Sequence, residues 1–184
     1  ENFGKRGTII IAHQNVRERL STNQHMKAFS RDVPASPKAA WPEITYENEL
    51  SLHLNGEDVH VFHVHNAHTD GDSFVWFEKA NVLHMGDCFF NKRFPFIDLG
   101  SGGTINGYIR AVSKALMVVN EDTKIIPGHG ELGTMDDLYA YHRMLKMMKR
   151  RVEKAISSGK SVEEMKTMGL DEGYEEWGKA FINA

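Results

Sequence analysis

The sequence predicts a layered α/β domain, and three observations lead to that prediction. In the first half of the chain, apolar and polar residues alternate in short runs, which is typical of half-buried strands. After the Gly102-Gly103 pair the apolar residues recur at helical spacing instead, from 105 to 119. A further strand and two more helices then follow. Strands followed by helix, strand and helices are the order of elements in an α/β layered fold.

The first elements are a strand, a short helix and a long loop. Residues 8–12 form an apolar, β-branched run that predicts a buried strand. Asn15 could cap a helical stretch over 16–20. Residues 21–43 contain three prolines and are interpreted as a loop. A loop of that length is often functional, for example as a flap over a site.

The main strands come next, and the first two form a hairpin. Apolar residues alternate with polar ones over 50–54, and Asn55-Gly56 is the strongest two-residue signal for a hairpin turn. The return strand is predicted over 58–64. Two further strands are predicted over 73–77 and 81–85.

The last elements are a strand over 124–127 and two helices. Thr134 and Asp137 have the spacing of a capping box, so a long helix begins there. Gly159 ends that helix, and Ser161 starts a shorter one.

Composition excludes several classes of protein. Lys and Arg number 22 against 25 Asp and Glu, which argues against a general grip on nucleic acid. There is no apolar run of membrane-spanning length, so we expect no membrane partner. The single cysteine, Cys88, excludes an internal disulfide framework and fits either a reducing compartment or the periplasm.

Three residues capable of binding a metal follow predicted strands. His68, Asp87 and His129 each lie in a glycine-containing loop at a strand end. Loops at one edge of a sheet converge in space, and glycine lets the backbone turn sharply beside each side chain. Two imidazoles and one carboxylate are a plausible part of a zinc or iron site.

Taken in order, these motifs resemble those of the metallo-β-lactamase superfamily. His68 in Ala-His-Thr-Asp-Gly-Asp is similar to its third motif, Asp87 in Met-Gly-Asp to its fourth, and His129 in Pro-Gly-His-Gly to its fifth. The resemblance covers roughly 8–130 and the long helix that follows. The chain resembles the zinc-dependent hydrolase group that includes glyoxylases more than it resembles the lactamases with cysteine at the fourth motif. Cys88, beside Asp87, is not predicted to be a ligand.

The resemblance implies one domain over 1–184 with a four-layer αββα sandwich fold. The family's His-x-His-x-Asp-His motif is absent, and it should precede a segment like 2–12. We therefore expect an incomplete copy of the domain, lacking its N-terminal part. The tail over 177–182 also resembles one that normally continues. Such a chain should expose apolar sheet surface and edge strands, and we expect a homodimer or a swapped oligomer.

The resemblance also implies a site and a chemistry. His68 would serve one metal and His129 a second, and the catalytic Asp87 would bridge the two. Zinc is expected, with iron or manganese as alternatives, and its hydroxide would attack a small-molecule ester, thioester, lactone or amide. With three donors this chain is expected to be weak or inactive. The alternatives are a fragment that only folds and self-associates, or an iron-bound redox member.

Other polar residues near these motifs have less defined roles. Asp70 and Asp72 could orient the ligands or simply cap the loop. His84 is expected to pack or hydrogen-bond within its strand, and Asp98 to line the edge of the site. His63 and His65, on one strand face, could support the site. The remaining histidines, interpreted as ordinary surface or helix residues, include His13, His25, His53 and His142.

Overall fold

The computed structural model describes residues 1–179; Phe181 and Ile182 of the predicted tail lie outside the described residues. The helices are α1 (Gln14–Ser21), α2 (Ile105–Leu116), α3 (Met135–Ser157) and α4 (Val162–Lys166). The strands are β1 (Ile11–His13), β2 (Gln24–Met26), β3 (Arg31–Val33), β4 (Ile44–Tyr46), β5 (Glu49–Leu54), β6 (Glu57–His63), β7 (Ser73–Phe77), β8 (Val82–Phe90) and β9 (Lys124–His129).

The main sheet has five strands in the order β5-β6-β7-β8-β9. Its first four strands are antiparallel to their neighbours, and β9 runs parallel to β8 after the crossover through α2. The predicted hairpin is confirmed, because Asn55 and Gly56 join β5 to β6. Both have positive φ, 55° and 76°, as a type I′ turn requires.

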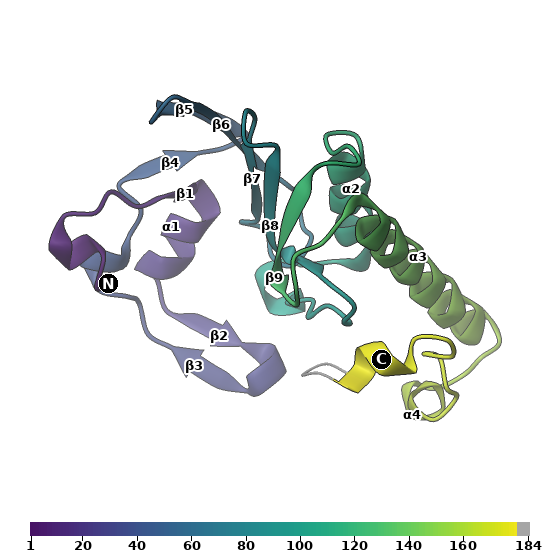
Figure 1. Cartoon of the computed structure of the whole chain (residues 1–184). Coiled ribbons are helices and arrows are strands. Elements are labelled where there is room, and N and C mark those ends of the chain that lie inside the picture. Colours follow the sequence, from purple (N-terminus) through teal and green to yellow (C-terminus); the bar gives the residue numbers. More distant parts are fainter. Residues whose placement is uncertain (180–184) are drawn as a thin grey trace.

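Helices α2 and α3 cover one face of this sheet (Figure 1). The predicted capping box is present at the start of α3, where the side chains and backbones of Thr134 and Asp137 bond reciprocally. The core between sheet and helices contains fully buried aromatic and aliphatic side chains, among them Phe74, Leu83, Met85, Tyr108, Tyr141 and Leu145. Burial of these side chains is the main stabilising contribution to this layer.

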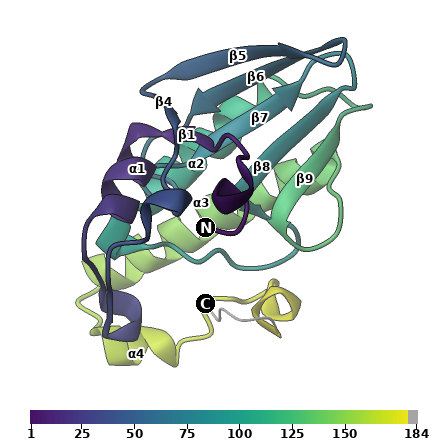
Figure 2. The same ribbon diagram turned by 90° about the vertical axis from the view of Figure 1, so that its left-hand side faces the viewer.

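The opposite face of the sheet is also apolar. Strands β1 and β4 form a separate parallel pair on that side, with α1 beside them (Figures 1 and 2). Val59, Val61 and Val75 of the main sheet face this pair. A sheet with two apolar faces requires a layer on each side. The predicted mixed α/β fold is therefore confirmed.

The N-terminal predictions need two corrections. The first strand is Ile11–His13 rather than 8–12, because these three residues are the ones that pair with β4. The helix begins at Gln14, earlier than predicted, and its cap is His13, whose Nδ1 accepts the backbone N–H of Asn15. Since imidazole is an uncommon capping group, the sequence favoured Asn15 instead.

The region 21–43 is not a plain loop. It contains the antiparallel hairpin of β2 and β3, whose pairs run from Gln24–Val33 to Met26–Arg31. These strands are three residues long and mostly polar, so no apolar alternation marks them in the sequence.

Strand β8 continues past its predicted end at Met85 to Phe90. The pairing with β9 is irregular on both sides of Gly86, which has a φ of 52°. Asp87 therefore lies within the strand at this irregularity, and not in a loop beyond it. No helix within residues 1–179 has both the length and the apolar character needed to cross a bilayer.

Candidate metal centre

The three predicted metal donors lie together at one edge of the main sheet. Asp87 Oδ2 is 3.5 Å from His68 Nε2, and Asp87 Oδ1 is 3.5 Å from His129 Nε2. Two donors that each lie about 2.0–2.1 Å from one tetrahedral zinc are about 3.3–3.4 Å apart. Each imidazole–carboxylate pair therefore has the separation needed to share a metal. The two carboxylate oxygens face different imidazoles, as in a bridging carboxylate.

The arrangement has two halves, His68 with Asp87 and His129 with Asp87, and each half has two protein donors. Over the described range 1–179, no group of three or more His, Cys, Asp or Glu side chains could hold a metal ion. Catalytic zinc usually has three protein ligands and a water. The donors present therefore fit part of a two-metal centre, and further ligands are needed to complete each half.

His68 is oriented by its second ring nitrogen. Nδ1 lies 2.8 Å from the backbone oxygen of Phe96. Because a carbonyl oxygen only accepts, Nδ1 must donate, which leaves Nε2 of the neutral ring with the lone pair that faces Asp87. The backbone of His68 is fixed as well, since its oxygen accepts the N–H of Asp98 at 3.0 Å.

Asp87 is positioned by two close neighbours. A Cβ on Gly128 would lie 2.1 Å from Asp87 Oδ1, so the space beside the carboxylate exists because residue 128 is glycine. The Tyr108 hydroxyl lies 2.5 Å from the backbone oxygen of Asp87 and 2.9 Å from that of Phe96. Burial raises the pKa of Tyr108 well above its ordinary value, which keeps the hydroxyl protonated as a donor. Tyr108 thus links the strand that carries Asp87 to the segment that orients His68.

His129 forms the open side of the centre. It is the last residue of β9, and its ring stacks on Phe90 with a centroid distance of 4.5 Å. Its side chain is 52% exposed, against 18% for His68. A small molecule can therefore reach the donors from the His129 side.

The residues predicted near the donors serve mainly to shape the backbone. Asp72 accepts the backbone N–H and the hydroxyl of Thr69, at 2.9 and 2.7 Å, and so closes the loop after His68. His84 accepts the N–H of Gly86 at 3.1 Å. Asp98 is buried and caps the 3₁₀ turn Leu99–Ser101 through two backbone N–H groups.

Asp70 has a partner that the sequence reasoning did not find. Arg19 of α1 donates from Nε to Asp70 Oδ1 at 3.0 Å and from Nη2 to Oδ2 at 2.6 Å. The hydrogen bond to Asp70 raises the pKa of the Arg19 guanidinium. The two residues are 51 positions apart, and no local pattern in the sequence pairs them.

His13 was predicted to be an ordinary surface or helix residue, and this is wrong. It is 7% exposed, and its ring stacks on that of His63 at a centroid distance of 3.8 Å. His63 in turn meets His65 edge to face at 4.4 Å. Burial, as the largest cause, lowers the pKa of His63. This stack joins β1 to the end of β6.

Cys88 is buried beneath the centre. Its Sγ lies 3.4 Å from Asp72 Oδ2, and burial raises the pKa of the thiol well above its ordinary value. The thiol faces Asp72 within the part of the chain that lies beside Asp87, and the expectation that Cys88 is not a ligand stays a prediction.

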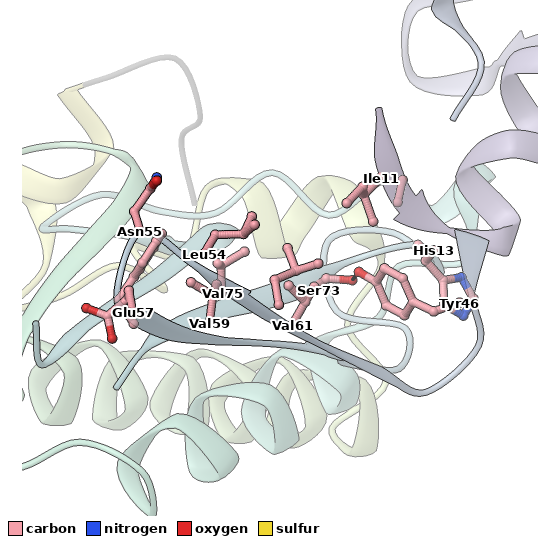
Figure 3. Close-up of a pocket in the computed structure, with 14 residues that line it drawn as sticks. Ile11, His13, Tyr46, Leu54, Asn55, Glu57, Val59, Val61, Ser73 and Val75 are labelled. Carbon is pink, nitrogen blue, oxygen red and sulfur yellow. Dashed lines mark hydrogen bonds between the residues drawn. The ribbon is translucent and has the colours of Figure 1, made fainter. Parts of the chain in front are cut away.

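A cavity of about 560 Å³ lies between the main sheet and the β1–β4 pair (Figure 3). None of the three donors lines it. Tyr46 reaches into one end, where its hydroxyl bonds to Ser73 Oγ at 2.5 Å. The apolar residues that line it include Ile11, Leu52, Leu54, Val59, Val61, Val75 and Phe77. The cavity marks the incompletely covered face of the sheet.

A mixed α/β domain with His and Asp donors grouped at one sheet edge is an arrangement found among metal-dependent proteins. The chain belongs to the metallo-beta-lactamase superfamily, whose family model matches residues 4–150. The expected relationship is thereby confirmed. Members of this superfamily are mostly metallohydrolases. No curated protein matches the chain.

Several solved structures share the fold. A metallo-beta-lactamase from Pontibacter korlensis is 12% identical with a TM-score of 0.61, covering 79% of this chain and 61% of that one. The BLEG-1 B3 metallo-beta-lactamase is 23% identical with a TM-score of 0.64, covering 78% and 68%. TTHA1623 in a di-iron-bound form is 18% identical with a TM-score of 0.57, covering 75% and 65%. The chain thus spans about three fifths of the Pontibacter structure's length.

Proposed function

We propose that this chain carries part of the binuclear metal centre of a hydrolase. The observation that supports the proposal is the position of Asp87, with one carboxylate oxygen 3.5 Å from each of two imidazole nitrogens. Each of these distances is close to the separation of two ligands on one tetrahedral zinc. The family relationship supports the same reading.

In this proposal His68 and Asp87 would hold one metal, and His129 and Asp87 would hold the second. When bound, the metals supply Lewis acidity and lower the pKa of a water to about 7. The chain's own residues fix the geometry. The Phe96 carbonyl sets the tautomer of His68, and Tyr108 holds the backbone of Asp87. The substrate class we propose is an ester, thioester, lactone or amide.

Zinc is the proposed metal, and iron is the alternative. Imidazole and carboxylate ligands suit both. One structure of similar fold is of a protein in a di-iron-bound form, which supports keeping iron in the test. Zinc in the centre would exclude the redox alternative, because zinc has no redox chemistry.

A second candidate is a noncatalytic domain that folds and self-associates. It is favoured by the donor count, since each half of the centre has two donors within residues 1–179. The two candidates differ in whether the chain takes up metal stoichiometrically.

The deciding experiment is the metal content of the purified chain by elemental analysis, with His68→Ala and His129→Ala as test variants. His53→Ala is the matched control, because His53 is an exposed histidine on β5 that bonds to Asp58. We expect one or two equivalents of zinc or iron, reduced in both test variants and unchanged in the control. Metal content that is absent, or that survives both substitutions, would rule out the proposed centre in this chain and favour the noncatalytic domain.

A further inference from the structure

The loop that carries His68 is held from two sides. On one side it contacts the segment 96–104. The Phe96 oxygen accepts from the His68 ring, and the N–H of Asp70 donates to the oxygen of Ser101 at 2.9 Å. A Cβ on Gly103 would lie 2.2 Å from the His68 oxygen, so the two backbones are in direct contact. These contacts fix the loop relative to the β8–α2 connection.

On the other side the loop is held by helix α1. Arg19 makes the two-pronged contact with both oxygens of Asp70, and the Asn15 side-chain amide donates to the Asp70 backbone oxygen at 2.9 Å. The helix also touches the loop directly, since a Cβ on Gly71 would lie 2.7 Å from a methyl group of Val16. Side chain, backbone and packing contacts from one helix therefore converge on the two residues after Thr69.

The Arg19–Asp70 pair has the features of a positioning contact. Two parallel N–H···O bonds fix the direction of a carboxylate as well as its distance. The side chains are 33% and 26% exposed, so solvent screens the pair less than it screens a surface ion pair. Asp70 is two residues from His68 in the same loop, so the pair restrains the backbone segment that carries the imidazole.

We propose that Arg19 is a positioning residue for the metal centre. Through Asp70 it holds the loop so that His68 Nε2 stays 3.5 Å from Asp87 Oδ2. The inference rests on the proposed function, in which His68 is a ligand. It adds helix α1 to the structure that determines metal affinity, although α1 supplies no donor of its own to the centre.

The test is a Co²⁺ titration of the chain and its variants, followed by absorbance. Arg19→Met keeps the aliphatic stem and removes both hydrogen bonds to Asp70, together with a bond from Nη1 to Gln24 Oε1. Arg17→Met is the matched control, because Arg17 lies on the same helix but bonds to the Pro42 oxygen and covers the Trp41 ring. We expect Arg19→Met to weaken Co²⁺ binding by about tenfold, as substitutions behind a metal ligand do. Arg17→Met should bind Co²⁺ like the unmodified chain.

Two more variants separate positioning from general destabilisation. Asp70→Asn should weaken binding as much as Arg19→Met, and the double variant should be no worse than either, because the residues act as one unit. Arg19→Lys retains the charge without the two-pronged geometry and should restore only part of the affinity. Wild-type affinity in folded Arg19→Met or Asp70→Asn, or an equal loss in Arg17→Met, would overturn the proposal.

Failure of the proposed function can be told apart from failure of this inference. If the unmodified chain binds no Co²⁺, the proposed metal centre is wrong for this chain. The positioning claim is then decided by hydrogen exchange at the Asp70 amide and by the NMR signals of the His68 ring. Faster exchange and an altered ring environment in Arg19→Met, but not in Arg17→Met, would support it. Unchanged signals in both variants would overturn it.

Discussion

Replacing Gly128 by alanine tests whether the space beside Asp87 is required. The new Cβ would lie 2.1 Å from Asp87 Oδ1, 2.7 Å from the carbonyl carbon of Gly86 and 2.8 Å from the Asp87 nitrogen. Real Cβ atoms essentially never approach other atoms closer than 3.0 Å. The carboxylate can rotate away from the methyl group, but the two backbone atoms cannot. Strand β9 must therefore move away from β8 at the point where both carry donors.

The expected magnitude has two parts. Overpacking by one methyl group costs about 1–3 kcal/mol of unfolding free energy. Displacement of Asp87 from between the imidazoles should also weaken metal binding, by about 10- to 100-fold on the scale of other substitutions that misplace a ligand. Both effects arise from one contact, so they should appear together.

The assay pairs urea unfolding with a Co²⁺ titration. Gly159→Ala is the matched control, because Gly159 has a φ of 74° after α3 and open space around it. That substitution should lower stability through backbone strain and leave metal affinity unchanged. If Gly128→Ala bound Co²⁺ as tightly as the unmodified chain, the close approach of β9 to Asp87 would not matter for the centre, and the argument from packing would be wrong.

Three further predictions follow, two from the burial of a side chain and one from the apolar face of the sheet. Because burial lowers the pKa of His63 below 6.5, the folded state favours its neutral form, and stability should fall as pH decreases from about 7 through the folded pKa. Urea unfolding at several pH values should show a smaller loss of unfolding free energy for His63→Asn than for the unmodified chain. An equal loss in both would show that the pH dependence does not arise from His63. The thiol of Cys88 should resist modification at pH 8 in the folded chain and react fully in urea, as absorbance of a thiol reagent would show; fast reaction of the folded chain would argue against its burial. The apolar sheet face should pair with a second copy of the chain, so sedimentation should show a dimer that Val75→Glu dissociates and the remote, exposed Val162→Glu leaves intact; a monomeric unmodified chain would exclude this association.

Local patterns in the sequence predicted the elements whose cause is local. The Asn55-Gly56 turn depends on two adjacent residues that tolerate positive φ, and the α3 capping box depends on Thr134 and Asp137. The grouping of His68, Asp87 and His129 was also anticipated, although Asp87 lies within β8 and not at its end as expected. Their role as ligands remains a prediction.

The features that the sequence did not predict depend on contacts between residues that are far apart in the chain. Strand β8 continues beyond Met85 because β9 pairs with it as far as Phe90, although the residues between lack apolar alternation. His13 is buried because His63, 50 positions later, stacks on it. Neither partner could be identified from the residues around it, because each pairing joins segments that are far apart in the chain.

The parallel pairing of β8 and β9 has a consequence for the order of folding. Asp87 and His129 are 42 residues apart in the chain and become neighbours only when the crossover through α2 has closed. His68 lies in the β6–β7 connection and is separated from Asp87 by 19 residues, which include one antiparallel connection, between β7 and β8. Contacts of greater sequence separation have a larger loop-closure entropy and form later. In the proposed metal centre, uptake at the His129–Asp87 pair should therefore lag behind uptake at the His68–Asp87 pair during refolding.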